Sequence, residues 1–269
     1  MRVDFHIHTN LSDGALDPEA VLELIAERKL KAWAITDHDL TEASQRYEDI
    51  PGAVSGCEVT TWAEGREVHV VALGTRLNDT PWQEVLCAIR HAREEYLVRL
   101  CQWLRQQHGI DVPDGAGRKQ SSRISSRAHL AAYLHQHHVV RSVGEAFQRY
   151  LGDAHIRHLA PPNYPPLEQA VAHIQAAGGV AILAHPAHYR DYGMVERLLH
   201  SSPLDGLEVR HPGCDSQWRS FLEHQAQSRG LLMSCGSDFH YPGPRRIGEH
   251  RLDGVRLAPL LERLNVSHR

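Results

Sequence analysis

Short runs of apolar residues recur along the chain, and most of them end in a cluster of polar residues. These runs predict seven strands, over residues 2–8, 32–36, 53–56, 68–72, 180–184, 206–209 and 231–235. Several are followed by segments with apolar positions three and four residues apart, which is typical of helices packed against a sheet. The alternation of continuous apolar strands with helices predicts an α/β protein with a mostly parallel sheet.

Capping residues mark the ends of three of the predicted helices. Asp17-Pro18-Glu19 supplies an N-cap carboxylate, a first-turn proline and a first-turn acid ahead of an apolar stripe. A helix over residues 167–177 ends at a pair of glycines, and another over residues 215–229 ends at Gly230. These signals indicate where the chain leaves each helix to enter the next strand.

The middle of the chain differs from both ends. Residues 81–108 have the apolar spacing of one long amphipathic helix, and sequence without strand signals follows it. Residues 118–157 contain seven Arg or Lys and two acids, a net charge of +5 within a chain whose formal net charge is −4. We therefore expect an acidic α/β body formed by residues 1–98 and 162–269, with a basic helical insertion over residues 99–161.

The composition excludes several classes of protein. The 269 residues, 42% hydrophobic and 23% charged, provide enough material for a large core. No apolar run approaches the roughly 20 residues that a bilayer-spanning helix needs, and the first strand leaves no room for a signal peptide. The five cysteines are dispersed without a CxxC pair, as expected for reduced thiols. We expect a cytoplasmic protein without a membrane partner, and no feature indicates an obligate protein partner.

Histidine is unusually frequent, with 21 residues, and it is the commonest protein metal ligand. His6 and His8 lie two residues apart on the first predicted strand and therefore project from one face of it. Further imidazoles and carboxylates lie at or near predicted strand ends: Asp13, His38, Glu58, His69, His185, Asp238 and His240. Barrels and open α/β sheets build active sites at those ends, so these nine residues predict a metal site. Asp37 and Asp39 flank His38 and are candidates to orient ligand histidines.

The motifs around these residues resemble those of the PHP (polymerase and histidinol phosphatase) phosphoesterases. The matching motifs are His6-x-His8-Thr9, Ser12-Asp13-Gly14, Thr36-Asp37-His38-Asp39, Gly56-x-Glu58, His69, Ala184-His185-Pro186 and Ser237-Asp238-Phe239-His240. The resemblance covers essentially the whole chain outside the insertion. It implies a distorted (β/α)7 barrel that holds a trinuclear centre of divalent metal ions, with Mn²⁺ favoured and Zn²⁺ or Fe²⁺ as alternatives.

The resemblance also implies how the ligands divide among the three ions. One set consists of His6, His8, Glu58 and Asp238. A second consists of Glu58 as a bridging ligand, His69 and His185. The third consists of Asp13, His38 and His240.

The predicted insertion narrows the resemblance to one subgroup. Its motifs are Ile124-Ser125-Ser126-Arg127-Ala128-His129, Phe147-x-x-Tyr150-Leu151 and Ala177-Gly178-Gly179. They look like those of the nucleoside 3′,5′-bisphosphate phosphatases and of the related bacterial 5′-to-3′ exoribonuclease, ribonuclease AM. By this resemblance Arg127 and His129 bind a substrate phosphate, from an insertion that caps the active site. His188 stands where the subgroup often has arginine, and Val-Arg-His-Pro follows Glu208; both departures concern the substrate and not a metal ligand.

Such a centre is suited to metal-assisted hydrolysis of a phosphoester. Water between two cations loses a proton near neutral pH and attacks phosphorus as a metal-bound hydroxide, so no covalent nucleophile is needed. Arginine positions the substrate through paired N–H donors. The leading hypothesis is hydrolysis of the 3′ phosphoester of a 5′-phosphorylated nucleotide or of an RNA 5′ end, because one pocket for the 5′ phosphate serves both substrates.

Other interpretations stay open at this point. A small-metabolite phosphatase of the histidinol-phosphate kind needs no basic insertion, and loss of Arg127 would change its affinity little. A regulatory module, or a proofreading module that serves a polymerase, would keep the metal site without turnover. For Arg127 and His129 the alternative is a solvated surface or a helix salt bridge. A solvated helix face is also predicted, against a metal-rich patch, for the histidines of the insertion: His135, His137, His138, His155 and His158.

Overall fold

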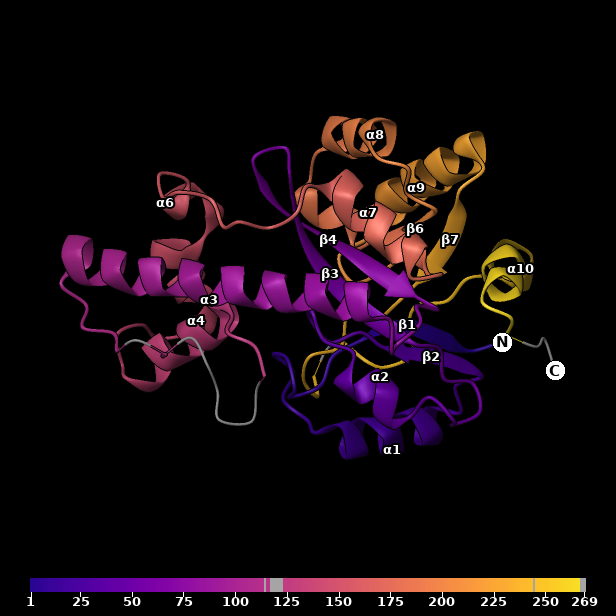
Figure 1. Ribbon diagram of the computed structural model, residues 1–269, viewed down its shortest axis with the longest axis horizontal. Helices are drawn as coiled ribbons and strands as arrows, with labels where there is room; N and C mark the ends of the chain where they lie inside the picture. Colours follow the sequence, from indigo (N-terminus) through magenta and orange to yellow (C-terminus); the bar gives the residue numbers. More distant parts are fainter. Residues whose placement is uncertain (114, 117–122, 244, 267–269) are drawn as a thin grey trace.

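The computed structural model describes residues 1–113, 115–116, 123–243 and 245–266 (Figure 1). Its seven strands are β1 (Val3–Ile7), β2 (Ala32–Ile35), β3 (Gly56–Ala63), β4 (Arg66–Leu73), β5 (Val180–Leu183), β6 (Gly206–Arg210) and β7 (Leu232–Cys235). β1 and β2 form a two-stranded sheet, and the other five form a second sheet in the order β3-β4-β5-β6-β7. The mixed α/β class and the number of strands are therefore as expected.

Isolated bridges connect the two sheets. Ile7, at the end of β1, bridges to Phe239 beyond β7, and His38, beyond β2, bridges to Glu58 in β3. These bridges bring the two ends of the five-stranded sheet next to β1 and β2. Within the described ranges, however, the strand ladders do not close into one continuous barrel.

The sheet contains an antiparallel hairpin that the strand pattern did not predict. β1–β2, β5–β6 and β6–β7 are parallel, whereas β3–β4 and β4–β5 are antiparallel. The strand expected over residues 53–56 begins instead at Gly56 and runs to Ala63. Glu64 and Gly65 then form a two-residue turn with φ of 51° and 75°. Positive φ at both turn positions matches the twist of an antiparallel pair, which explains why the chain folds back here.

Helices pack around the sheets (Figure 1). They are α1 (Pro18–Arg28), α2 (Glu42–Arg46), α7 (Leu167–Ala176), α8 (Tyr192–Ser201), α9 (Ser216–Arg229), α10 (Gly254–Arg263) and the 3-10 helix η2 (Pro186–Tyr189). The capping signals of α1 and α9 are confirmed, because Asp17 and Asp215 accept hydrogen bonds from first-turn N–H groups. No helix in the described ranges is long and apolar enough to cross a bilayer.

The long helix α3 (Thr80–His108) connects two hydrophobic clusters. Its 29 residues correspond to about 44 Å. Trp82 and Leu86 pack into the main core with the five-stranded sheet, whereas Leu100 and Leu104 pack into a second cluster. The boundary expected between residues 98 and 99 thus falls inside one continuous helix.

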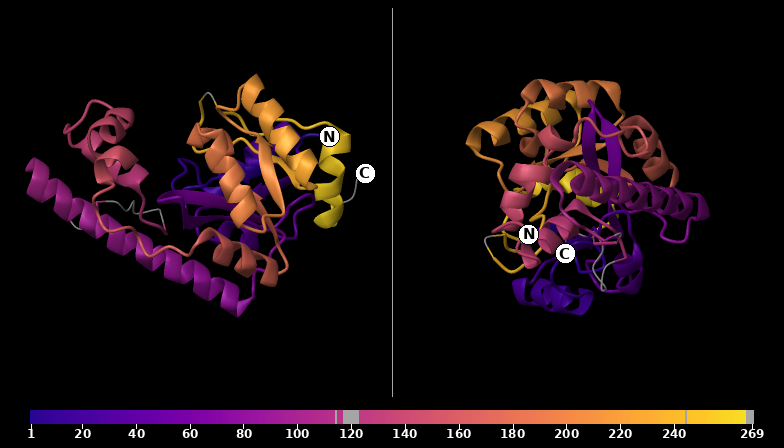
Figure 2. Two further views of the ribbon diagram at one scale, coloured as in Figure 1. Left: turned by 90° about the horizontal axis from the view of Figure 1, so that it is seen from above. Right: turned by 90° about the vertical axis from the view of Figure 1, so that its left-hand side faces the viewer.

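The second cluster holds the remaining helices together. These are α4 (Arg127–Gln136), α5 (Val143–Ala146), the π-helical turn η1 (Phe147–Leu151) and α6 (Asp153–Ile156). They lie beside the C-terminal half of α3, away from most of the sheet (Figure 2). The described residues between 109 and 161 contain no strand, as predicted. The five histidines of this segment are exposed, which confirms the solvated face expected for them: His135, His137, His138, His155 and His158.

Candidate metal centre and substrate pocket

The nine predicted metal ligands converge at one place in the fold. β1 and the residue after it supply His6 and His8, the next loop supplies Asp13, and His38 follows β2. The hairpin contributes one residue from each strand, Glu58 from β3 and His69 from β4. The ends of the parallel strands supply the others: His185 after β5, and Asp238 and His240 after β7.

The Glu58 carboxylate is the centre of this cluster. One of its oxygens lies 3.1 Å from Nε2 of His6, 3.1 Å from Nε2 of His8 and 3.2 Å from Nδ1 of His38. The other lies 3.1 Å from Nδ1 of His69 and 2.9 Å from Nε2 of His185. Five imidazoles therefore surround one carboxylate that is almost fully buried.

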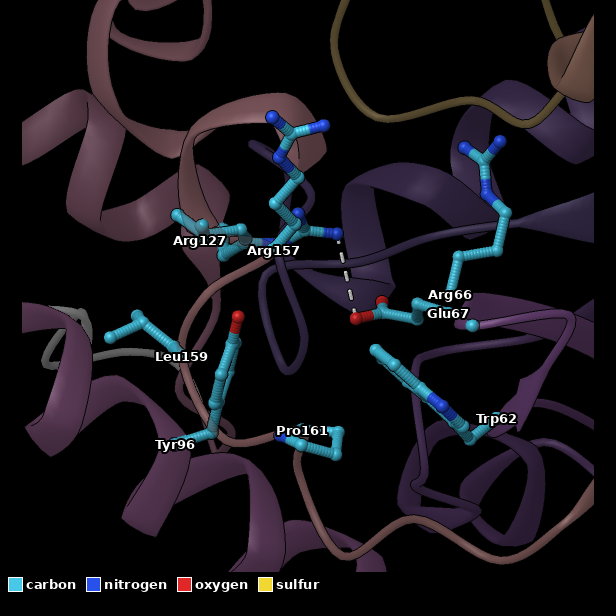
Figure 3. Close-up of a pocket in the computed structure, with 10 residues that line it drawn as sticks. Trp62, Arg66, Glu67, Tyr96, Arg127, Arg157, Leu159 and Pro161 are labelled. Atoms are coloured by element: carbon cyan, nitrogen blue, oxygen red, sulfur yellow. Dashed lines mark hydrogen bonds and ion pairs between the residues drawn. The ribbon is translucent and has the colours of Figure 1, made fainter.

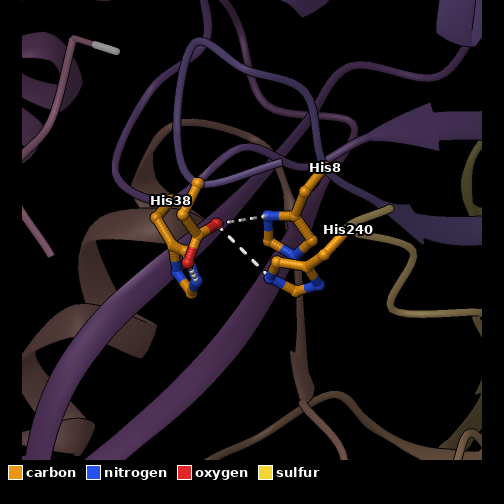
Figure 4. Close-up of side chains that lie close together, drawn as sticks. His8, His38 and His240 are labelled. Carbon is orange, nitrogen blue, oxygen red and sulfur yellow. Dashed lines mark ion pairs between the residues drawn. The ribbon is translucent and has the colours of Figure 1, made fainter. Parts of the chain in front are cut away.

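Two more carboxylates complete the cluster. Oδ1 of Asp238 lies 3.4–3.6 Å from ring nitrogens of His6, His8 and His240. The carboxylate of Asp13 lies 3.3 Å from His240, 3.7 Å from His38 and 3.9 Å from His8 (Figure 4). Each of the three carboxylates in the cluster therefore lies close to several imidazole rings.

Three groups of ligand atoms lie close enough together to hold an ion each. The first group is His6, His8, Glu58 and Asp238; the second is His38, Glu58 and His69; the third is His8, Asp13, His38 and His240. The first group coincides with one expected ligand set. The other two differ from the expected sets in detail, because His38 and His8 are shared between groups and His185 contacts only the Glu58 side of the cluster.

Many polar atoms of the cluster are buried without a hydrogen bond. They are Nε2 of His6, both ring nitrogens of His8, Nδ1 of His38, Nδ1 of His185, Oδ1 of Asp13 and Oε2 of Glu58. Leaving a buried polar atom unpaired costs roughly 1–3 kcal/mol, so such a set is stable only with another partner. Mixed imidazole and carboxylate donors are the ligands of Mn²⁺, Zn²⁺ and Fe²⁺. The residues therefore fit divalent cations.

Electrostatics keep the three carboxylates of the cluster ionised. Burial alone raises the pKa of Glu58, but the neighbouring imidazoles outweigh it and hold that pKa well below its usual range. The same balance lowers the pKa of Asp13 and Asp238. Burial lowers the pKa of His38 to about 3, against the attraction of Glu58 and Asp13. Against the effect of burial, the carboxylates raise the pKa of His69 and His240 to about 10, so a metal ion that binds here would release protons from these rings.

A second layer of carboxylates holds the histidines, and sequence reasoning missed it. Glu208 lies 3.1 Å from Nδ1 of His6 and accepts a 2.7 Å hydrogen bond from the His185 N–H. Glu67 lies 2.8 Å from Nε2 of His69. A signal for Glu67 was present, because two residues apart on a strand it shares a face with His69. Gly236 leaves the space for Glu208, since a Cβ there would collide with its carboxylate.

Asp37 and Asp39 were expected to orient ligand histidines, but they contact other groups. Asp37 accepts hydrogen bonds from Thr9 and Ser12, so it fixes the loop that follows His8. Asp39 accepts from the N–H and hydroxyl of Thr60 and pairs with the buried Arg93. Both carboxylates act on loops and strands that carry the cluster, and their hydrogen bonds go to backbone, hydroxyl and guanidinium groups instead of histidine rings.

Backbone conformation at the cluster is unusual. Asp39, His185 and Asp238 have φ of 53°, 31° and 47°, in the left-handed region that residues other than glycine rarely adopt. Such conformations persist where surrounding contacts impose them and are concentrated at functional sites. Here they turn the chain sharply where strands β2, β5 and β7 end, which directs side chains into the cluster.

A pocket of about 290 Å³ adjoins the cluster (Figure 3). Its polar and aromatic lining comes from the hairpin, α3 and the helical segment: Trp62, Arg66, Glu67, Tyr96, Arg127 and Arg157. Arg127 lies 3.5 Å from Glu67, the carboxylate that holds His69. The pocket and the cluster therefore meet at Glu67.

The two residues expected to bind phosphate together face different cavities. Arg127 lines the pocket beside Glu67, whereas His129 is buried in α4 and lines a separate cavity with Asp13. They are two residues apart on a helix, which places them on different sides of it. His188 is exposed, and its ring stacks on that of His185 with centroids 4.8 Å apart.

Residues 4–236 match the PHP domain family model. The chain belongs to the PHP domain family. It is 31% identical over 252 residues to the 5′-3′ exoribonuclease Rnm of Escherichia coli strain K12, across 90% of this chain and 86% of that protein. It is 33% identical over 255 residues to a 3′,5′-nucleoside bisphosphate phosphatase of Chromobacterium violaceum, across 90% of this chain and 88% of that protein.

Two solved structures share the fold of this chain. A structure from Chromobacterium violaceum, described as an amidohydrolase with bound sulfate and no metal, matches with a TM-score of 0.86 at 28% identity, over 98% of this chain and 96% of that one. A structure from Bifidobacterium adolescentis, described as a metal-dependent phosphoesterase, matches with a TM-score of 0.81 at 27% identity, over 97% and 96%. The protein is therefore an enzyme, a metal-dependent phosphoesterase of the PHP family.

Proposed function

We propose that the enzyme hydrolyses the 3′ phosphoester of nucleotides that also carry a 5′ phosphate. Its substrates are nucleoside 3′,5′-bisphosphates, short 5′-phosphorylated RNA, or both. The names of the relatives from Escherichia coli and Chromobacterium violaceum support this substrate class. The observation that carries the proposal is the pocket with three arginines beside the ligand cluster.

The nine clustered residues would hold three divalent ions, with Mn²⁺ favoured. Glu58 would be shared between ions, because its two oxygens face different sets of imidazoles. When bound, such ions acidify water and neutralise charge on the phosphoryl oxygens. Glu208 orients His6 and Glu67 orients His69, because each carboxylate contacts a ring nitrogen of its histidine.

The pocket would hold the 5′-terminal nucleotide. Arg66, Arg127 and Arg157 supply guanidinium donors for the 5′ phosphate, and Trp62 and Tyr96 offer aromatic surfaces for the nucleoside. The nucleotide's 3′ oxygen then points toward the cluster across Glu67. Hydrolysis forms a bond between water oxygen and phosphorus, breaks the bond between phosphorus and the 3′ oxygen, and transfers a proton to that oxygen.

The same bond cleavage gives different products from the two substrates. A nucleoside 3′,5′-bisphosphate yields a nucleoside 5′-monophosphate and free phosphate. RNA yields a nucleoside 5′-monophosphate and a chain that is one nucleotide shorter and again carries a 5′ phosphate. Repetition of the second reaction is 5′-to-3′ exonuclease activity.

In this proposal, residues 99–161 cap the active site. Arg127, Arg157 and Leu159 of that segment line the pocket, opposite Trp62 and Arg66 of the hairpin. We also propose a cytoplasmic location, because all five cysteines are free thiols.

Phosphate release and product chromatography test the proposal. Mn²⁺-loaded enzyme is offered adenosine 3′,5′-bisphosphate, histidinol phosphate and a 5′-phosphorylated RNA oligomer. Turnover of the bisphosphate, with mononucleotides released from the RNA 5′ end, is the expected result. Preference for histidinol phosphate, with the other two substrates untouched, would contradict it.

A further inference from the structure

A second arginine-rich region lies outside the ligand cluster and the substrate pocket. Arg2, Arg28, Arg246 and Arg251 line a pocket of about 220 Å³ with one acidic residue, Glu249. We call these four arginines the arginine strip. Arg28 and Arg246 also line a neighbouring pocket of about 360 Å³, so the two pockets adjoin each other, and together we call them the groove.

The arginine strip carries excess positive charge, because its four arginines share the pocket with a single glutamate. Among the described residues, none of its four guanidinium groups forms an ion pair with a carboxylate. This includes the carboxylate of Glu249, which lines the same pocket. Arg2 donates a 2.8 Å hydrogen bond to the backbone carbonyl oxygen of Arg28, and the side chains of both residues line the same pocket. Converging guanidinium groups repel one another, and an anion relieves that repulsion. The strip is therefore suited to a polyanionic ligand.

The groove leads away from the ligand cluster. Its wider part is lined by Phe239 and Arg245, and Arg245 forms an ion pair with Asp238 of the cluster. The chain then runs back along β1, where Gly248 donates a 2.7 Å hydrogen bond to Asp4 and lies against the stem of Arg2. Asp4 and His8 are four residues apart, so this stretch of strand covers roughly 13 Å. Arg2 is two residues further from His8, so this part of the arginine strip lies roughly 20 Å from the cluster along the strand.

The substrate pocket and the wider part of the groove adjoin the cluster at different residues. The substrate pocket meets it at Glu67 and His69, whereas the groove meets it at Asp238 and Arg245. A chain whose first nucleotide fills the substrate pocket places its scissile phosphate at the cluster. The remainder of that chain then leaves on the Asp238 side.

We propose that the arginine strip binds the phosphate backbone of RNA downstream of the scissile bond. This inference rests on the proposed function, and it makes RNA, not only a free nucleotide, a substrate for which the enzyme is built. A nucleoside bisphosphate has no phosphate beyond the scissile one and cannot reach the strip. A 5′-phosphorylated dinucleotide cannot reach it either, but each further nucleotide adds one phosphate to the downstream chain.

The test compares substrates of increasing length. The value of kcat/KM is measured for adenosine 3′,5′-bisphosphate and for 5′-phosphorylated RNA of two, four, six and ten nucleotides, with wild type and with Arg246→Glu/Arg251→Glu. Wild-type kcat/KM is expected to rise with length. The variant should lose about tenfold on the decamer, keep its activity on the bisphosphate and dinucleotide within about twofold, and show a salt dependence for the decamer that is shallower by about 1.4 in logarithmic slope.

A matched control separates local binding from overall charge. Arg229→Glu/Arg263→Glu makes the same change in net charge with two exposed arginines outside the groove. It should follow the wild-type length dependence. An equal loss in the control, an equal loss on every substrate, or no loss on the decamer would each overturn the assignment of the strip.

A binding measurement makes the inference independent of turnover. Fluorescence anisotropy of a 3′-labelled, 5′-hydroxyl RNA decamer is measured with the Mn²⁺-loaded proteins. The strip variant should bind about tenfold more weakly than wild type and control. If wild type hydrolyses neither the bisphosphate nor the dinucleotide, the proposed function fails, and the binding result alone decides on the strip; equal binding by all three proteins would overturn it.

Discussion

Glu67 and His69 are joined by a 2.8 Å contact between a carboxylate oxygen and Nε2, while Nδ1 of the same ring lies 3.1 Å from Glu58. The other oxygen of Glu67 lies 3.5 Å from Arg127, which also lines the substrate pocket. One side chain therefore contacts both a candidate metal ligand and a candidate phosphate-binding residue. The pocket and the cluster are built around a shared carboxylate.

We predict that Glu67→Gln weakens metal binding. Glutamine keeps the shape of glutamate but loses the charge that makes the His69 ring a stronger ligand, so affinity for the weakest-bound Mn²⁺ should fall about 10- to 100-fold. Isothermal titration calorimetry of Mn²⁺ with metal-free protein measures this change. The control is Glu64→Gln, at the hairpin turn, where the carboxylate pairs with Arg197 of α8 and is not part of the ligand cluster. Equal Mn²⁺ affinity in both variants would show that Glu67 does not support the ligand.

Glu58→Gln should abolish turnover while the fold persists. The substitution removes the charge that five imidazoles surround, so shared metal coordination is lost. We expect a fall in kcat/KM of at least about 100-fold and fewer than three bound ions by elemental analysis. Asp13→Ala and His38→Ala should behave similarly. Circular dichroism checks the fold, and near-normal rates with a native spectrum would disprove the shared role of Glu58.

Arg127→Ala should slow the hydrolysis of substrates that carry a second phosphate and leave the hydrolysis of other substrates nearly unchanged. Loss of one charge-assisted hydrogen bond costs about 1.5–3 kcal/mol, so kcat/KM for adenosine 3′,5′-bisphosphate should fall about 10- to 100-fold. Hydrolysis of p-nitrophenyl phosphate, which has a single phosphate, should change little. Arg127→Lys should restore only part of the loss, because lysine lacks the paired donors of arginine. A uniform loss on both substrates would assign Arg127 to the structure of the site.

The buried pair between Arg93 and Asp39 should be important for stability. The two side chains are 7% and 0% exposed, with a 2.7 Å contact. Arg93→Ala leaves the Asp39 carboxylate buried without its partner, which should lower the free energy of unfolding by about 3–5 kcal/mol. Urea denaturation measures this free energy of unfolding. Arg46→Ala, which breaks an exposed pair with Glu19, should have little effect. Similar midpoints for the two variants would contradict the prediction.

Metal removal should destabilise the protein as well as inactivate it. Ions that bind only the folded chain stabilise it by about 2.7 kcal/mol at a hundredfold excess over Kd. For a chain of this length, a chelator should therefore lower Tm by about 5 °C or more, and added Mn²⁺ should reverse the shift. Differential scanning calorimetry provides the measurement. In Glu58→Gln the shift should be smaller, and an identical Tm with and without Mn²⁺ in wild type would argue against a metal centre.

The sequence predicts the cluster better than it predicts its surroundings. His6, His8 and Asp238 are found because strand ends collect functional groups, and the strand pattern is local. Glu208 escapes notice, because nothing near it in sequence marks its contact with His6, whereas Glu67 is marked only by sharing a strand face with His69. Such contacts depend on how distant strands pair, and pairing is a property of the whole fold.

The substrate pocket is even less visible in the sequence. Arg127 and Glu67 are 60 residues apart, and they meet because an antiparallel hairpin reaches toward the helical segment. The hairpin itself depends on the Glu64-Gly65 turn, whereas the apolar pattern predicts only a short strand before it. Grouping Arg127 with His129 by motif likewise overlooks that residues two apart on a helix point in different directions.

The continuity of α3 has a consequence for which bond is cut. The helix packs into the main core at Trp82 and contributes Tyr96 to the substrate pocket. At Leu104 it packs into the second hydrophobic cluster, with the helices of residues 127–156. Under the proposed function, the helix would therefore set the distance between the pocket for the 5′ phosphate and the ligand cluster. One inserted residue before Tyr96 would advance everything beyond it by 1.5 Å and rotate it by about 100°. Relatives that differ in the length of this helix should measure a different distance along their substrates, so the choice of scissile bond would change without any change in the metal ligands.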